Sequence, residues 1–299
     1  MATYKEKFDG QSKKNRFLFD YLTVNIKDMY PEQVIDFLCS KCSNPDMIKE
    51  NFYYHDTGVL TGYNNSYRFL QSRFISISWR NYTDVNTGEI IDVDKRQGVA
   101  LNITGTGCRF FTIQDFVNLF TELINNHDCN FTRLDVAFDD FTGVIPHEEI
   151  INSLDTWTGT NKVVSTRARL SNFRIYKNFS QGSVSNSSFG YNFDLGSNGS
   201  SMKVRMYDKK VEQNRSDLSY WKRFELQLRR EKAIGFIYSF MGSGSFAIPF
   251  AEYLSNFMRF LVDNDVLGND LDKVKTAPFW DSFIQALRNF DSLKYTFKE

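Results

Sequence analysis

The sequence predicts an α+β fold: a largely antiparallel sheet with helices on one face, followed by a C-terminal helical segment. Strand-like runs, in which apolar and polar residues alternate, follow one another with Gly- and Asn-rich turns between them. Only a few stretches with helical spacing lie between these strand-like runs. The chain therefore lacks the regular alternation of strands and helices that is typical of a doubly wound parallel sheet. Helical spacing then dominates the chain after Lys232.

The first half of the chain begins with a polar stretch, residues 1–16, which we expect to be a flexible arm. A strand is predicted from Phe17, and a helix over residues 31–42. Residues 52–103 have the pattern of a strand meander. Thr112 precedes a helical pattern, with Asp115 three residues later as an approximate capping box.

The second half starts with a strand at 132–140 and a helix that opens with Pro146, a favoured first-turn residue. Two more strands are predicted at 203–210 and 221–230. We therefore divide the chain into the arm, a main domain over 17–232, and a C-terminal helical region over 233–299. The helical pattern of that region includes residues 247–265 and predicts a layer that packs on the sheet or on a small core of its own.

Three of these strands carry most of the chemical information. Because successive side chains of a strand point to opposite faces, each run separates into an apolar and a polar side. The apolar side holds Leu134, Val136, Phe138, Val204, Met206, Phe224, Leu226 and Leu228. The polar side holds Arg133, Asp135, Asp139, Arg205, Tyr207, Lys209, Arg223, Glu225, Gln227 and Arg229. If the strands share a sheet, carboxylates, cations and a tyrosine gather on one face.

This set contains the groups needed for metal-assisted attack of a tyrosine hydroxyl on a phosphodiester. A phenol with a pKa near 10 is a poor nucleophile at neutral pH unless a cation or base favours its ionised form. Arg205 and Lys209 flank Tyr207 on the same side of the strand and can stabilise that charge. Asp135 and Glu225 are the first choices as ligands of a divalent ion, with Asp139 third. The alternative is that Asp135 and Glu225 form cross-strand ion pairs with Arg133 and Arg223.

In the order RLDVAFD, RMYDKK and RFELQLR, these segments resemble the catalytic core of Rep_trans rolling-circle replication initiators and of the related relaxases of integrative conjugative elements. The GTGCR segment at 105–109 resembles the relaxase-like branch, and the matches together span residues 17–232. The resemblance implies a nickase that cuts one strand at an origin, stays joined to the 5′ phosphate through Tyr207 and leaves a free 3′ hydroxyl.

The resemblance also bears on individual residues. It favours Tyr207 over Tyr176, which lies in a similar Arg-x-Tyr-Lys string but lacks the following DKK. Asp20 matches an aspartate of the family's first strand, but it alternates with Leu22, Val24 and Ile26, so we expect a structural role. DNA contacts are expected from the cations of the matched strands and their ends: Arg133, Lys210, Arg223, Arg229 and Arg230.

Composition agrees with this interpretation. The net charge is zero, yet residues 162–232 hold 15 Lys and Arg against 6 Asp and Glu, which indicates a basic surface for phosphates. The alternative is that these cations simply solvate exposed strand edges. Cys39 and Cys42 lack a second pair for a zinc site, and no His-x-His pair occurs, so Mg²⁺ or Mn²⁺ held by oxygen ligands is expected. Without a signal peptide or spanning segment, we expect a cytoplasmic protein with no membrane partner.

Two other functions stay open. A relaxase would nick a conjugative transfer origin, whereas a non-catalytic binding module would use the sheet to hold single strands without cutting them. The resemblance implies DNA as the partner, as an origin in single-stranded or extruded hairpin form, together with a helicase and a homodimer. It also offers origin recognition or dimerisation as an alternative role for the C-terminal region.

Overall fold

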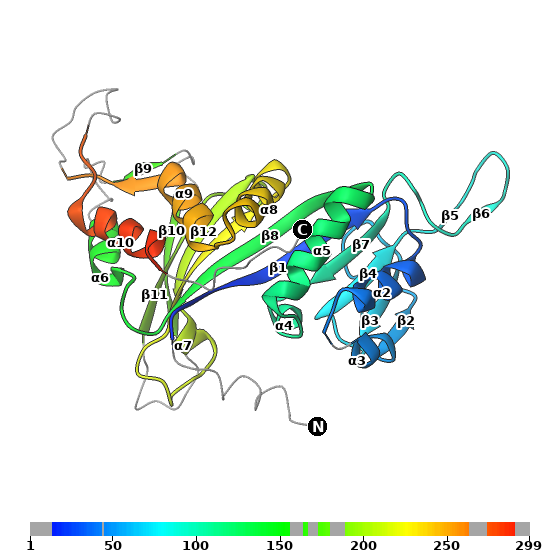
Figure 1. Cartoon of the computed structure of the whole chain (residues 1–299), viewed down its shortest axis with the longest axis horizontal. Coiled ribbons are helices and arrows are strands. Elements are labelled where there is room, and N and C mark those ends of the chain that lie inside the picture. The colour runs from blue at the N-terminus through cyan, green and yellow to red at the C-terminus, as the bar shows by residue number, and fades with distance from the viewer. Residues whose placement is uncertain are drawn as a thin grey trace.

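A ten-stranded sheet forms the centre of the structure, a computed structural model that describes residues 14–43, 45–155, 164–166, 173–179, 189–262 and 274–290 (Figure 1). The strand order is β10-β11-β12-β13-β8-β1-β7-β4-β3-β2, and every pairing is antiparallel. The predicted α+β class with a largely antiparallel sheet is therefore confirmed.

The sheet is built from long central strands and shorter strands toward one edge. Its members are β1 (Arg16–Ile26), β2 (Phe52–His55), β3 (Asn65–Phe69), β4 (Ile75–Trp79), β7 (Val99–Ile103), β8 (Cys129–Asp140), β10 (Phe173–Phe179), β11 (Phe189–Leu195), β12 (Met202–Asp208) and β13 (Lys222–Leu228). Two small pairs lie outside it, β5 (Tyr82–Thr83) with β6 (Ile90–Ile91), and β9 (Val164–Thr166) with β14 (Met258–Phe260).

The longer helices lie over one side of the central strands (Figure 1). In the described residues the helices are α2 (Pro31–Ser40), α3 (Pro45–Lys49), α4 (Gly105–Cys108), α5 (Ile113–Asn126), α6 (His147–Asp155), α7 (Lys209–Glu212), α8 (Glu231–Ser243), α9 (Ala247–Phe257) and α10 (Pro278–Arg288). The short α4 lies instead against β1, and α7 directly follows β12 and contacts β13 (Figure 1). Among the helices of the described part, none is long and apolar enough to cross a membrane.

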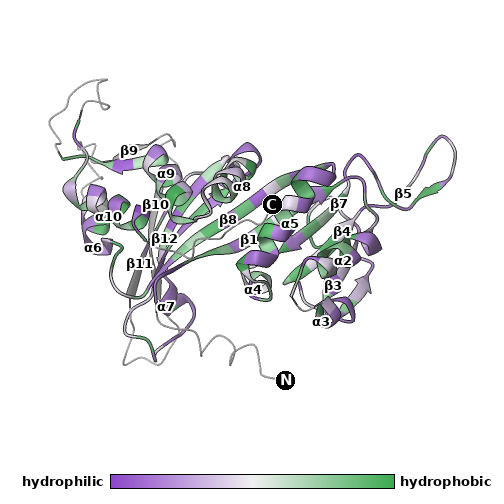
Figure 2. Ribbon diagram, viewed as in Figure 1, coloured by the Kyte–Doolittle hydropathy of each residue, from purple (hydrophilic) through white to green (hydrophobic). Residues whose placement is uncertain are grey.

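The core lies between the sheet and the long helices and is rich in phenylalanine. Phe19 of β1 contacts Phe116 of α5 at a ring-centroid distance of 4.9 Å and Phe240 of α8 at 5.4 Å. Phe17 packs on Phe250 of α9 at 5.1 Å. All eight residues assigned to the apolar side of the three strands are fully buried in the same core, as predicted. Figure 2 shows the alternation of hydrophobic and hydrophilic residues along β8.

The helices after residue 232 cover this sheet rather than enclose a separate core, since α8 and α9 reach the side chains of β1. One helix is shorter than its pattern predicted. The spacing predicted a helix over 247–265, but α9 ends at Phe257 and the next three residues form β14, paired with β9. By contrast, α5 begins with the predicted capping box: Thr112 accepts from the Asp115 amide, and the Asp115 carboxylate accepts from the Thr112 amide.

An irregularity in β1 changes which residues face the polar side. Phe19 pairs with Val136 and Tyr21 pairs with Asp135, so Asp20 is an extra residue in the strand, a β-bulge. Before the bulge the odd-numbered Phe17 and Phe19 face the helices, whereas after it Leu22, Val24 and Ile26 are buried. The alternation from which we assigned Asp20 a structural role is therefore interrupted at Asp20 itself.

Candidate active site on the polar face of the sheet

Polar side chains from four neighbouring strands, β12, β13, β8 and β1, meet on the face opposite the long helices. The register places Tyr207 opposite Arg223, and Arg223 opposite Asp139. In the neighbouring row, Arg205 lies opposite Glu225. The prediction that the three matched segments lie side by side in one sheet is confirmed.

The Tyr207 hydroxyl donates a hydrogen bond of 2.8 Å to Oε2 of Glu225. Both residues are almost fully buried, at 6% and 2% exposure, yet Tyr207 is turned toward the acids and away from the phenylalanine core. Burial, followed by the negative charge of Glu225, raises the pKa of Tyr207 well above its ordinary value. The resting state is therefore a neutral phenol that donates to a carboxylate.

Two cations flank the Tyr207 ring, as the spacing predicted. The guanidinium carbon of Arg205 lies 5.2 Å from the ring centroid, and Nζ of Lys209 lies 5.3 Å from it. Arg205 also pairs with Oε1 of Glu225 at 3.2 Å and with Asp194 at 3.3 Å. Lys209 pairs with Glu212 in the first turn of α7, and its pKa is lowered, first by burial and then by the charge of Arg223.

The position of Tyr207 follows from where β12 ends. Asp208 is the N-cap of α7, since its side chain accepts from the Val211 amide at 3.0 Å. Its other carboxylate oxygen lies 2.5 Å from Nζ of Lys222 on β13. Asp208 thus ends β12 directly after Tyr207 and starts α7. The change of backbone direction brings Lys209, the first residue of α7, to the Tyr207 ring.

Asp135, the other leading ligand candidate, is 2% exposed and held by Arg133 of its own strand. Arg133 contacts both of its oxygens, with Nε to Oδ1 at 2.9 Å, and lies over the Tyr21 ring at 3.9 Å. Burial raises the pKa of Asp135 to about 7 against the opposing effect of Arg133, and the charges of Glu225 and Asp20 add to the rise. Acidic side chains therefore repel one another across this face.

Asp139 and Arg223 occupy positions that differ from those we expected. Both are fully buried, and Arg223 binds Asp139 through two contacts of 2.7 and 3.0 Å. Arg16 pairs with the same carboxylate at 3.3 Å. Burial alone would raise the pKa of Asp139, but Arg223 and Arg16 hold it below its ordinary value. A carboxylate so neutralised is a poor metal ligand, and a fully buried Arg223 offers no surface to DNA, so we propose structural roles for both in place of the metal and DNA roles that the sequence predicted.

Asp20 is the residue whose position our reasoning missed. Its Oδ1 lies 2.8 Å from Nη1 of Arg223, and its charge contributes to the raised pKa values of Asp135 and Tyr207. The sequence carries a signal for this: apolar residues at 17 and 19 followed by 22, 24 and 26 change parity, as a bulge requires. Asp20 thus belongs to the polar cluster.

The GTGCR segment lies against this acid. A Cβ atom on Gly105 would be 2.9 Å from Oδ1 of Asp20, and one on Gly107 would be 2.2 Å from the carbonyl oxygen of Phe74. Both glycines are therefore needed for the close approach of α4 to β1 and to the residue before β4.

A metal site is only partly assembled. Within the described ranges, no group of three or more His, Cys, Asp or Glu side chains is arranged to hold a metal ion. Burial is the main cause of the raised pKa of Asp135, and the charges of Glu225 and Asp20 add to it; a divalent cation would offset those charges. Asp135 and Asp20 lie on this face, and each is paired with one arginine, Arg133 and Arg223 respectively, whereas Asp139 is paired with two.

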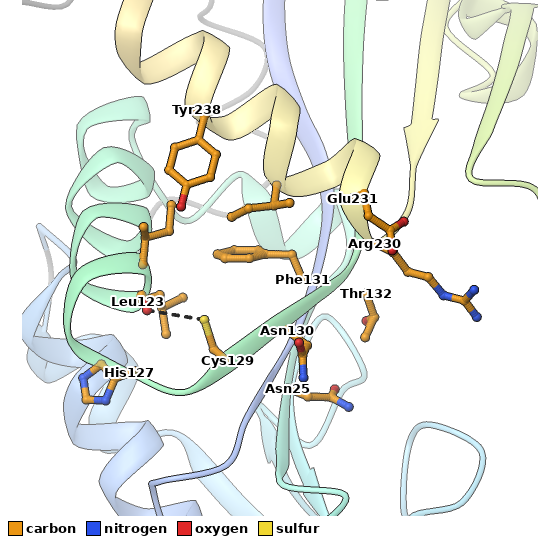
Figure 3. A pocket seen from close by; sticks show the side chains of 12 residues that line it. Asn25, Leu123, His127, Cys129, Asn130, Phe131, Thr132, Arg230, Glu231 and Tyr238 are labelled. Carbon is orange, nitrogen blue, oxygen red and sulfur yellow. Dashed lines mark hydrogen bonds between the residues drawn. The ribbon is translucent and has the colours of Figure 1, made fainter.

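The remaining predicted DNA contacts lie at both ends of the cluster. Lys210 is half-buried in α7, Arg229 is half-buried at the end of β13, and Arg230 is exposed. Burial and the charge of Arg133 lower the pKa of Arg229. Arg230 also lines a separate cavity of about 610 Å³ between α5, α8 and the start of β8 (Figure 3), where its side chain extends away from Tyr238 and Phe131. None of the predicted catalytic residues lines that cavity.

The alternative nucleophile, Tyr176, lies on β10, opposite Asn192 of β11. Two strand spacings, about 10 Å, separate its backbone from β12. The contacts of its side chain lie outside the described part of the chain.

Known proteins resemble this chain in sequence and in fold. It is 25% identical over 203 residues to the putative DNA relaxase NicK of Bacillus subtilis (strain 168), a match that covers 64% of this chain and 54% of that protein. The chain thus spans about half the length of this curated relative. The structure of a rolling circle replication initiator protein from Geobacillus stearothermophilus has the same fold, with a TM-score of 0.72 and 22% identity, covering 95% of this chain and 100% of that one.

A family model described as replication initiation factor matches residues 129–298. This match includes α8, α9 and α10, beyond residue 232 where the motif resemblance ended. Because the match spans more than half of the chain, the protein belongs to the Rep_trans family of replication initiation factors.

Proposed function

We propose that this protein nicks one strand of DNA at an origin by tyrosine transesterification and so initiates rolling-circle replication of a plasmid or mobile element. Tyr207 is the nucleophile; it remains joined to the 5′ phosphate and leaves a free 3′ hydroxyl. The observation that carries the proposal is the hydrogen bond of 2.8 Å between Tyr207 and Glu225, between two cations and on the strands that match the family. Family membership and the likeness to a putative DNA relaxase support the DNA substrate.

The surrounding cations suit the charge that develops during attack. Arg205 and Lys209 lie on either side of the reacting oxygen's ring and would stabilise negative charge on the phenol and the phosphate. Arg133, Arg229 and Lys210 lie farther out, where they would contact the phosphate backbone on both sides of the cleaved bond.

We propose Mg²⁺ or Mn²⁺ as the cofactor, held by Asp135 together with Asp20. Bound there, such an ion would polarise the scissile phosphate and orient it. The charges of Glu225 and Asp20, which add to the effect of burial in raising the pKa of Asp135, support this assignment, because a bound cation would offset them.

The test is incubation of the purified chain with supercoiled DNA of its own replicon and Mn²⁺, followed by mapping of the nick and of the attached residue. We expect a covalent 5′ adduct on Tyr207, which is lost in Tyr207→Phe and retained in Tyr176→Phe. An adduct that survives Tyr207→Phe would refute the nucleophile assignment. Cleavage should cease in EDTA while much of the DNA binding remains, whereas a non-catalytic binding module would show no cleavage under either condition.

A second candidate function is that of a relaxase at a conjugative transfer origin, and the likeness to the putative DNA relaxase NicK favours it. Two complementation assays separate these functions. A replication initiator should restore replication of a plasmid that lacks its own initiator gene, whereas a relaxase should restore conjugative transfer of an element that lacks its relaxase gene. A helicase, a homodimer and a cytoplasmic location remain predictions under either function.

A further inference from the structure

Glu225 differs from Asp135 and Asp139 in its partners: arginines hold both oxygens of those two acids, whereas one oxygen of Glu225 accepts from the Tyr207 hydroxyl. Oε2 accepts from the Tyr207 hydroxyl at 2.8 Å, and Oε1 accepts from Nη1 of Arg205 at 3.2 Å. A carboxylate has about four lone-pair positions, and in Glu225 one position on each oxygen is taken, one by the nucleophile's own hydroxyl and one by Arg205. The side chain is 2% exposed, so solvent does not compete for it.

We propose that Glu225 is the general base that removes the phenolic proton of Tyr207, rather than a ligand of the metal ion. This inference rests on the proposed function, since it concerns the nucleophile of that reaction. The geometry satisfies the first requirement for a base, which is direct hydrogen-bond contact with the proton that it must take.

The environment of the phenol explains why a base is needed. Burial and the charge of Glu225 keep Tyr207 protonated at rest, so the proton must leave as the new bond to phosphorus forms. The bulk solvent has little access to a side chain that is 6% exposed. The acceptor already in contact, Glu225, is therefore the group that can take the proton during attack.

Arg205 would act as a positioning residue for this base. It bridges Asp194 of β11 and Glu225 of β13, and it fixes the Glu225 carboxylate so that its second oxygen faces Tyr207.

The step balances without an added reactant. The Tyr207 oxygen forms a bond to phosphorus, the bond between phosphorus and the 3′ oxygen breaks, and the phenolic proton passes to Glu225. The departing 3′ oxygen gains a proton from water, and Glu225 releases its own to solvent, so no net proton is consumed. In the joining reaction, the attacking 3′ hydroxyl loses its proton to solvent, and Glu225, after taking up a proton from solvent, gives it to the leaving phenol oxygen.

The test compares Glu225→Gln, Asp135→Asn and the wild-type chain in single-turnover cleavage and in Mn²⁺ binding by calorimetry. Glu225→Gln keeps the shape and a hydrogen-bond acceptor but removes the base. We expect it to slow cleavage by about 10²–10⁴-fold, the usual contribution of a general base, with Mn²⁺ affinity close to wild type. Asp135→Asn should instead weaken Mn²⁺ binding. Glu122→Gln, a paired glutamate on α5, is the matched control and should change neither property.

Two further measurements identify the role. In Glu225→Gln only the phenolate reacts, so the cleavage rate should rise about tenfold per pH unit. Replacing Tyr207 by a ring-fluorinated tyrosine, whose phenol is more acidic, should rescue Glu225→Gln while affecting the wild type little. A substrate with sulfur in place of the departing 3′ oxygen should not rescue it, because the defect lies in the nucleophile.

The inference would be overturned if Glu225→Gln lost Mn²⁺ affinity as Asp135→Asn does and gained nothing from the fluorinated tyrosine. If Glu225→Gln did not fold, as judged by its thermal melt, Glu225→Asp, which withdraws the carboxylate from Tyr207, should show the same slow and rescuable cleavage. Failure of the proposed function would look different, since the wild-type chain itself would then form no adduct.

Discussion

Arg223 and Asp139 face each other across β13 and β8 as a fully buried ion pair, with Nε of the arginine 2.7 Å from Oδ1 of the aspartate. Arg16 and Asp20 extend this pair on β1, so that the network joins three neighbouring strands beneath the candidate nucleophile. Such an arrangement stabilises the sheet only while every charge keeps its partner.

We therefore predict a structural role for Asp139. Asp139→Asn removes the charge that Arg223 faces and should lower the free energy of unfolding by about 3–5 kcal/mol, the usual cost of breaking a buried pair. Urea denaturation monitored by circular dichroism measures this. The control is Arg96→Ala, which breaks an exposed pair with Asp94 and should leave the transition unchanged. A variant Asp139→Asn that is as stable as wild type but has lost Mn²⁺ binding would restore Asp139 as a ligand.

Asp135 should make stability depend on pH in the opposite sense from an ordinary paired carboxylate. Its pKa is raised from 3.8 to about 7 in the folded chain, so the folded state binds its proton more tightly than the unfolded state does. This contribution is fully present below pH 4 and is lost as the pH rises toward and through 7. The wild type should thus lose stability relative to Asp135→Asn between these values.

Thermal melts of both chains across that pH range, without divalent ions, measure the difference. Parallel curves for the two chains would show that Asp135 ionises normally in the fold. Addition of Mn²⁺ should restore stability to the wild type at pH 7 and above, because only the ionised carboxylate binds the cation.

The glycines of α4 give a third prediction. Gly107→Ala would bring a Cβ to 2.2 Å from the Phe74 carbonyl oxygen, and Gly105→Ala would bring one to 2.9 Å from the Asp20 carboxylate. We expect Gly107→Ala to destabilise the fold, since backbone must move. We expect Gly105→Ala, whose Cβ would also lie 3.0 Å from the Asp20 backbone carbonyl oxygen, to displace Asp20 and so to weaken Mn²⁺ binding as well as lower the melting temperature. Gly242→Ala in α8, where nothing lies within 4 Å of the added Cβ, is the control and should be neutral or stabilising.

Strand alternation predicted the two faces of the central sheet because its period depends only on the backbone. It placed Leu134, Met206 and Leu226 in the core and Tyr207 with Glu225 on the polar face, as the structure has them. Alternation could not predict which charged side chains form ion pairs with one another. In the structure Glu225 pairs with Arg205 rather than with Arg223, and Arg223 pairs with Asp139. Those pairs depend on how far each side chain reaches between strands, which no local pattern encodes.

The helical region shows a similar limit. The spacing of apolar residues continues past Phe257, but the chain leaves the helix there because β14 finds a partner strand in β9. Tertiary pairing of this kind overrides local propensity. The bulge at Asp20, in contrast, was readable from the change of parity in β1 and was missed because a single alternation was assumed for the whole strand.

The cations that remain accessible should govern the salt dependence of DNA binding. Arg229 is half-buried and Arg230 is exposed, and both lie just after the end of β13, next to the polar face. Arg223, in contrast, is buried and forms ion pairs with Asp139 and Asp20. Each phosphate contact that is lost lowers the slope of log affinity against log salt by about 0.7 for a single strand. Arg229→Ala and Arg230→Ala should therefore each reduce this slope by somewhat less than one and weaken binding to all sequences alike.

Fluorescence anisotropy with a labelled single strand over a series of salt concentrations measures these slopes. Lys49→Ala is the control, because Lys49 is exposed on α3, which packs on α2 at the far end of the sheet, and is paired with Asp36. If either arginine variant kept the wild-type slope, its side chain would make no phosphate contact, and the path of the strand would have to run from Tyr207 toward Lys210 instead.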